Sequence, residues 1–249
     1  MEILAQFLLR LTFGLALGMA ITSPRKVSSG FFRNHLYVTL GLATLAALVL
    51  LQSSQTASLF AAAAAVASFL GAAFWLYDAK AAGRMSLLIV LASSLAAAML
   101  IEPTVTFEDA PSRLQTIAVI TSGMLLGITT TAMLLGHWYL NAPGMELAPL
   151  RRLLDVDMLC VGMQALVSGT GLIAELKLQT DAPFAWLLFV VLRWSFGLFG
   201  VLALVWMARE TLKIPNTQSA TGILYVAVIG VFVGELTAAL LSSESMFPL

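Results

Sequence analysis

Long apolar stretches constrain this chain more than any other feature of its sequence. Eight of them approach the roughly 20 residues that an α-helix needs to cross the hydrocarbon core of a bilayer. They run from Ile3 to Ile21, Leu36 to Leu51, Ser58 to Tyr77, Met85 to Ile101, Leu114 to Gly136, Met158 to Ala174, Pro183 to Met207 and Ala220 to Leu241. The sequence therefore predicts an all-α integral membrane protein, with residues 1–249 forming a single polytopic domain of eight transmembrane helices.

Composition excludes several classes of protein. Only 10% of the residues are charged, against roughly 25% in soluble domains. The net charge is zero, so no electrostatic footprint for a nucleic acid exists. No phosphate-binding glycine loop is present, which argues against a nucleotide partner. One cysteine and two histidines give no metal-ligand pattern, so we expect no metal site. No catalytic motif appears, and a non-catalytic membrane role is favoured over an enzyme.

The positions of lysine and arginine predict the orientation. Nine of these residues fall in connections at one end of the expected bundle: Arg25, Lys26, Arg33, Lys80, Arg84, Arg151, Arg152, Arg209 and Lys213. The opposite connections hold two, Arg113 and Lys177, and gather acidic residues: Glu2, Glu102, Glu108, Asp109, Glu175, Asp181 and Glu244. Basic connections stay on the cytoplasmic side. We therefore expect a bacterial inner-membrane protein with both termini in the periplasm.

Two segments indicate an internal duplication. LALGMAITSPRKVSSGFFR begins at Leu15, and MLLGHWYLNAPGMELAPLRR begins at Met133. Their shared features pair Gly18 with Gly136, Pro24 with Pro143, and Arg33 with Arg151. Residues 1–110 and 111–249 would then form two parallel four-helix halves. The alternative is that two helix exits share common turn residues, since glycine and proline are ordinary turn signals.

Glycines spaced four apart occur in three of the expected spans. The pairs are Gly14 with Gly18, Gly123 with Gly127, and Gly230 with Gly234. Residues four apart share one face of a helix, and glycine lets two helix backbones approach closely. These faces predict tight packing within the bundle or against another subunit.

Three ionisable residues, Arg10, Arg193 and Glu235, lie well inside expected spans. A charge inside the membrane costs a few kcal/mol and therefore faces protein or water. At 1.5 Å per residue, all three lie roughly 10–15 Å below the end that carries the termini. We predict that Arg193 pairs with Glu235. The layer is interpreted either as an ion pair that fixes helix register or as part of a path for a solute or proton. No span shows a clear helix break near its middle.

The two histidines, His35 and His137, are both expected at the basic end. His137 is followed by Trp138 and Tyr139, which together offer a hydrogen-bond donor and flat apolar walls. A quinone head group needs both. The sequence thus gives a candidate quinone site with help from His35. A single haem held by the two histidines is less favoured. The alternative is that these side chains only anchor the helices at the interface.

Two functions from different classes remain open. The favoured one is an integral membrane subunit or anchor of a larger energy-converting or redox complex, which contacts other membrane subunits. The alternative is a transporter of small solutes or ions that uses Arg10, Arg193 and Glu235. The cofactor is left open beyond the candidate quinone.

The predicted orientation can be tested by cysteine labelling. A membrane-impermeant thiol reagent should modify Lys213→Cys only from the cytoplasmic side and Asp109→Cys only from the periplasmic side. Labelling of Lys213→Cys from the periplasm would contradict the orientation.

Overall fold

The computed structural model describes residues 2–101, 110–142, 144–178, 183–214 and 216–249, and these contain helices and no strand. The helices are α1 (Glu2–Ile21), α2 (Ser29–Leu50), α3 (Gln55–Leu76), α4 (Lys80–Ile101), α5 (Ala110–Asn141), α6 (Ala148–Leu178), α7 (Phe184–Leu192), η1 (Arg193–Gly200), α8 (Val201–Thr211) and α9 (Thr217–Ser243). Because α7, the π-helical η1 and α8 are continuous, they form one span. The described residues thus contain eight helices long and apolar enough to cross a membrane, which confirms the predicted all-α bundle.

Several helices extend beyond the expected apolar stretches, most of all α6. This helix begins at Ala148, ten residues before the expected start at Met158. Pro149 falls in its first turn, where the missing N–H of proline is tolerated. The early start places Arg151, Asp155 and Asp157 on a helix rather than in a connection. Hydropathy alone misses such a start because a helix continues through polar residues at the membrane edge.

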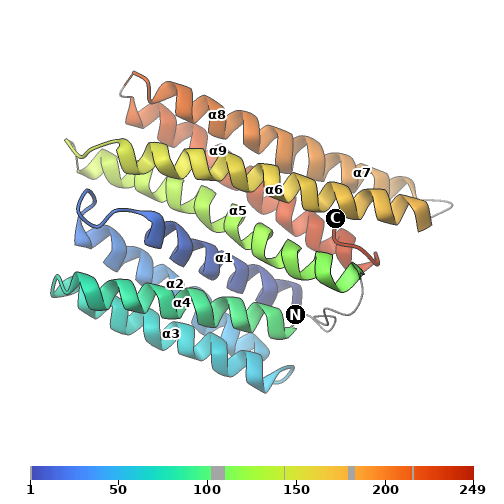
Figure 1. The fold of residues 1–249 in the computed structure, drawn as a ribbon, viewed down its shortest axis with the longest axis horizontal. Coiled ribbons are helices and arrows are strands. Elements are labelled where there is room, and N and C mark those ends of the chain that lie inside the picture. Colours follow the sequence, from blue (N-terminus) through green and yellow to red (C-terminus); the bar gives the residue numbers. More distant parts are fainter. Residues whose placement is uncertain (1, 102–109, 143, 179–182, 215) are drawn as a thin grey trace.

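The eight helices form two groups of four with the same pattern of neighbours (Figure 1). In the first half, α2 packs on α1 and α3, and α4 closes the group against α3 and α1. In the second half, α6 packs on α5 and α8, and α9 closes the group against α8 with η1 and α5. The main contact between the halves is α1 against α5. This arrangement agrees with two parallel four-helix halves. The duplication itself stays a prediction, and Pro143 lies outside the described residues.

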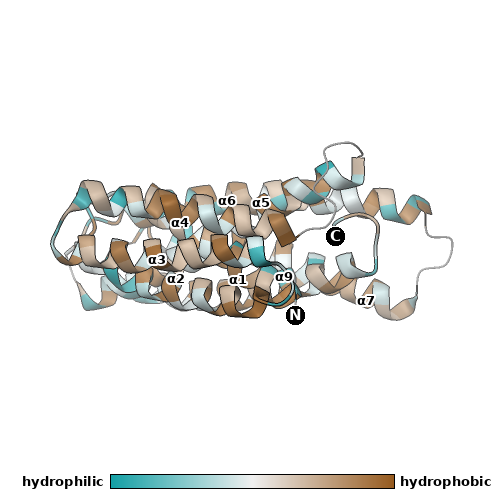
Figure 2. Ribbon diagram, turned by 90° about the horizontal axis from the view of Figure 1, so that it is seen from below, coloured by the Kyte–Doolittle hydropathy of each residue, from teal (hydrophilic) through white to brown (hydrophobic). Residues whose placement is uncertain are grey.

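Both termini lie at one end of the bundle, which we call the terminal end (Figure 1). The nine basic residues lie at the opposite, basic end, in the connections and in the helix turns next to them. Figure 2 shows hydrophobic residues along the length of the helices and hydrophilic residues toward both ends of the bundle. Four acidic residues counted for the terminal end lie outside the described residues: Glu102, Glu108, Asp109 and Asp181.

Glycines bring the two halves into backbone contact. A Cβ atom on Gly14 of α1 would lie 2.7 Å from Cα of Gly127 in α5. It would also overlap the carbonyl oxygen of Gly123. A second close approach joins η1 and α9, where a Cβ on Gly197 would lie 2.6 Å from Cα of Gly234. The predicted glycine faces therefore pack inside the bundle, as expected for close helix pairs.

Replacement of Gly127 by alanine should separate the halves. The new methyl group would overlap the backbone of Gly14, so the loss should reach or exceed the roughly 1–3 kcal/mol typical of overpacking. The measurement is the free energy of unfolding in detergent. Gly162→Ala in α6 is the matched control, because a Cβ there meets nothing within 4 Å. Equal stability of the two variants would contradict backbone contact between α1 and α5.

Candidate functional site

Arg193 and Glu235 form a buried ion pair. Nη2 of Arg193, the first residue of η1, donates to Oε1 of Glu235 in α9 at 2.8 Å. The two side chains are 1% and 3% exposed. Gly234 makes room for the guanidinium, because a Cβ there would lie 3.0 Å from Nη1 of Arg193. The predicted pair is confirmed, and the glycine contact between η1 and α9 explains how it fits.

The segment that presents Arg193 departs from α-helical geometry. Residues Arg193–Gly200 form a π-helix of eight residues in the middle of the seventh span. Such segments are rare and frequently occur at functional sites. The sequence predicts no break there, and no proline marks the position. The π-helix packs against α9 at the Gly197–Gly234 contact, which a local sequence pattern does not report.

The ion pair continues as a hydrogen-bonded chain into the first half. Oγ of Ser122 in α5 donates to the second carboxylate oxygen of Glu235, Oε2, at 2.5 Å. Nη1 of Arg10 in α1 lies 3.5 Å from Oγ of Ser122, and Nε of Arg10 donates to Oε1 of Gln6 at 3.2 Å. Nε2 of Gln6 then donates to the carbonyl of Ala98 in α4 at 2.8 Å. Arg10, Glu235 and Arg193 thus meet in one layer. We call them, with Ser122, the ion layer.

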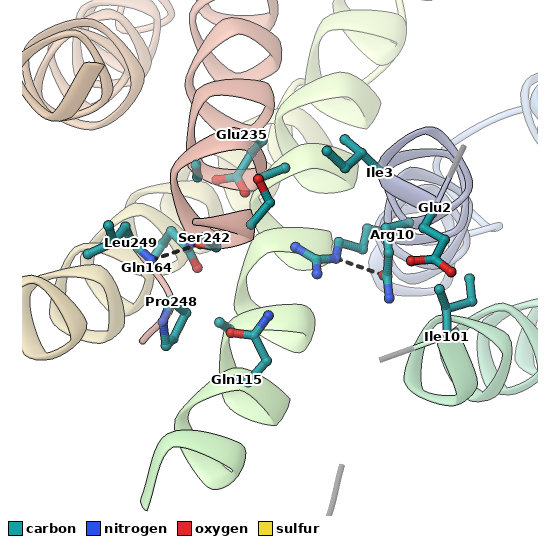
Figure 3. Close-up of a pocket in the computed structure, with 15 residues that line it drawn as sticks. Glu2, Ile3, Arg10, Ile101, Gln115, Gln164, Glu235, Ser242, Pro248 and Leu249 are labelled. Carbon is teal, nitrogen blue, oxygen red and sulfur yellow. Dashed lines mark hydrogen bonds between the residues drawn. The ribbon is translucent and has the colours of Figure 1, made fainter. Parts of the chain in front are cut away.

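A cavity of about 320 Å³ leads from the terminal end to the ion layer (Figure 3). Both halves contribute polar side chains to its wall: Gln6, Arg10, Gln115, Gln164, Glu235 and Ser242. The exposed residues Glu2 and Ser243 lie at its rim. Arg10 follows Glu2 by eight residues on α1, so the cavity extends about 12 Å into the bundle. Its volume lies at the lower end of the range for small-molecule sites, about 300–1,000 Å³.

The segment that follows α9 completes one wall of this cavity. It folds back toward α6, where the backbone N–H groups of Met246 and Phe247 donate to Oε2 of Glu175 at 3.1 and 3.3 Å. The N–H of Leu249 donates to Oγ of Ser242 at 3.1 Å. Pro248 and Leu249 are thereby held against the cavity.

Two polar residues of α6 were not recognised in the sequence. Gln164 accepts a hydrogen bond from Thr121 at 2.5 Å and lines the cavity. Asp157 is fully buried, and its Oδ1 accepts from Thr129 at 2.8 Å. Its other oxygen has no hydrogen-bond partner within the described ranges. The seven-residue spacing of Asp157 and Gln164 puts both on one helix face. That spacing is the signal that could have found them, had α6 been expected to begin earlier.

The candidate quinone residues face different neighbours. Nδ1 of His137 lies 3.1 Å from Oη of Tyr225 in α9. Nε1 of Trp138 donates to Oγ of Ser28 at 3.1 Å. Oη of Tyr139 donates to the carbonyl of Glu146 at 2.6 Å. Successive residues of an α-helix are turned by about 100°, so three consecutive side chains do not line one pocket.

His35 packs among aromatic rings at the basic end. Its Nδ1 is 2.6 Å from the carbonyl oxygen of Phe31, and its ring packs on that of Phe31 and beside that of Trp138. Neither the cavity above nor a smaller one of about 90 Å³ beside Trp75 is lined by His35, His137, Trp138 or Tyr139. The quinone and haem interpretations therefore stay predictions. In the part of the chain that the structure describes, no group of three or more His, Cys, Asp or Glu residues could hold a metal ion.

The fold and the site together define a polytopic helical membrane protein with a polar cavity between two four-helix halves. No protein family model, curated protein or solved structure matches the chain. The function must therefore be inferred from the cavity and the ion layer.

The coupling between Arg193 and Glu235 can be measured by a double-mutant cycle. Glu235→Gln or Arg193→Gln alone leaves a buried charge without its partner, which costs about 3–5 kcal/mol. The double variant removes both charges, so it should be more stable than the sum of the two losses predicts. The free energy of unfolding in detergent is the measurement. Strictly additive losses would argue against the direct contact.

Proposed function

We propose that the protein transports small solutes that carry a carboxylate group, with the cavity as their binding site. The observation that supports this proposal is that Arg10 and Glu235, two residues of the ion layer, line a cavity that reaches the terminal end. Ionisable residues inside a membrane are costly, and those beside a cavity typically mark a path for a solute or ion. A purely structural ion pair would not require a polar cavity above it.

The chemistry of the wall favours a carboxylate. Arg10 places a guanidinium on the cavity, and its planar set of N–H donors matches the two oxygens of a carboxylate. The amides of Gln6, Gln115 and Gln164 supply further donors and acceptors. The volume of about 320 Å³ limits the solute to the size of a short organic acid or a small amino acid.

The charged residues take different roles in this proposal. Arg10 contacts the solute. Glu235 already accepts hydrogen bonds from Arg193 and Ser122, so it orients Ser122 and shapes the floor of the cavity. Arg193 is a positioning residue, because it acts through Glu235. The apolar remainder of the wall, such as Ala118 and Ala238, excludes water around the solute.

The orientation belongs to the same proposal. The basic end faces the cytoplasm of a bacterial inner membrane, as the distribution of lysine and arginine favours. The cavity then opens to the periplasm, and the solute enters from outside. The interpretation as a subunit of a redox complex stays a prediction, since His137, Trp138 and Tyr139 do not share a cavity described above.

Uptake into proteoliposomes tests the proposal. The probes are radiolabelled lactate, alanine and succinate, and at least one should accumulate. Arg10→Gln should reduce its uptake by about tenfold or more, because a hydrogen bond to a charged group contributes roughly 1.5–3 kcal/mol. Arg10→Lys, which keeps the charge without the planar donor set, should fall between Arg10→Gln and the unmodified protein.

The matched control is Arg113→Gln. Arg113 is an exposed arginine near the same end that does not line the cavity, so this variant should retain uptake. Uptake of none of the three probes would contradict the proposed solute class. Full uptake by a folded Arg10→Gln variant would contradict the role of Arg10.

A further inference from the structure

The contacts between the two halves differ along the membrane normal. At the terminal end the halves are separated by the cavity. In the middle, Gly14 and Gly127 bring their backbones together. At the basic end, polar and aromatic side chains from connections and helix ends join the halves. The protein is thus open at one end and closed at the other.

Besides buried apolar packing between the halves, the closed end has a small set of polar and aromatic contacts that we call the latch. Nζ of Lys26, after α1, donates to Oε2 of Glu146, before α6, at 2.7 Å. Nε1 of Trp138 in α5 donates to Oγ of Ser28, which precedes α2. The indole also packs edge-on against Phe31, with ring centroids 6.0 Å apart. The latch therefore crosses from the first half to the second at two adjacent places.

The ion pair of the latch can be broken at low cost. The side chains of Lys26 and Glu146 are 42% and 62% exposed, and ion pairs of that exposure contribute only about 0–1 kcal/mol. The contact of Gly14 with Gly127 joins two backbones and contains no side chain that could change its rotamer. We therefore expect it to stay fixed while the two halves move relative to each other at the terminal and basic ends. Parting of the basic ends about this fixed contact brings the terminal ends together.

We infer that the two halves rock about the Gly14–Gly127 contact between two states. One state is the present one, with the cavity open and the latch closed. In the other state the latch is parted and the cavity is closed toward the terminal end. Rocking of one helical repeat against the other around a fixed site is a common means of alternating access. This inference rests on the proposed function, since it makes the cavity of that proposal reachable from each side in turn.

The ion layer agrees with such a motion. Arg10 belongs to the first half and Ser122 to the second, and their 3.5 Å separation is the longest hydrogen-bond distance in the layer. Glu235 and Arg193 both lie in the second half, and their 2.8 Å pair moves as one body with Ser122. Closure of the cavity shortens the Arg10–Ser122 contact and leaves the ion pair unchanged.

Two cysteine reporters can follow the two ends of the molecule. Ala239→Cys lies in the cavity wall. Thr131→Cys lies between the halves on the latch side of Gly127, packed against Gly18, and Thr131 is 1% exposed. The native Cys160 is buried within the second half and reports unfolding. Each full-length variant is placed in nanodiscs, where a maleimide reaches both ends, and labelling rates are read by peptide mass spectrometry.

Charge reversal in the latch should shift the two reporters in opposite directions. In Lys26→Glu, repulsion by Glu146 should raise labelling of Thr131→Cys by roughly two- to fivefold, the range that an exposed ion pair allows. Labelling of Ala239→Cys should fall by a similar factor. The exchanged pair Lys26→Glu with Glu146→Lys should restore both rates. Unchanged rates, or a rise at both reporters, would overturn the rocking motion.

Unfolding is distinguished by Cys160, which should remain unlabelled in every variant. If Lys26→Glu exposes Cys160, the milder Glu146→Gln variant takes its place, with shifts in the same directions. Absence of those shifts in Glu146→Gln would equally overturn the motion. No solute is present in these measurements. Opposite shifts without uptake of any probe would leave the motion standing and reject the solute class. Uptake of a probe without opposite shifts would support the solute class and overturn the rocking motion.

Discussion

Direct contact between the backbones of α1 and α5 is the interaction on which the rest of the structure depends. Lipid tails are as apolar as leucine side chains, so helices in a membrane associate mainly through close packing and hydrogen bonds rather than through the hydrophobic effect. Gly14 and Gly127 allow that packing at the shortest range. The same short range lets Arg10 reach Ser122 across the interface and lets Lys26 reach Glu146. A wider separation of the halves would interrupt both.

The ion layer shows how a membrane interior accommodates three charges at once. The guanidinium of Arg193 donates a hydrogen bond to one carboxylate oxygen of Glu235, and the hydroxyl of Ser122 donates to the other. Ser122 also accepts from Arg10, whose second nitrogen is bound by Gln6. Each polar group therefore reduces the desolvation cost of the next. The arrangement needs helices from both halves, which places the polar cavity between them rather than within either one.

Much of this architecture could be predicted from the sequence, because it depends on local properties. Hydropathy gives the eight spans, and the fixed rise per residue gives the matched depth of Arg193 and Glu235, hence their pairing. What depends on neighbouring helices could not be predicted. The π-helical segment at Arg193 and the burial of Asp157 are seen only in the packed bundle, and the early start of α6 runs through polar residues that hydropathy does not count. The proximity of His137, Trp138 and Tyr139 in sequence suggested one pocket, but helical rotation turns them to different partners.

The residues of the ion layer are synthesised far apart in time. Arg10 belongs to the first helix, and Glu235, the acidic residue of the ion layer, follows about 225 residues later. At roughly 5–20 residues per second, Glu235 of α9 is synthesised on the order of ten to fifty seconds after Arg10. Gln6, one turn away on the same helix, is a partner that is present from the start. The membrane insertion machinery thus receives a first helix that already carries a hydrogen-bond partner for its own charge, and this partner is kept in the complete fold.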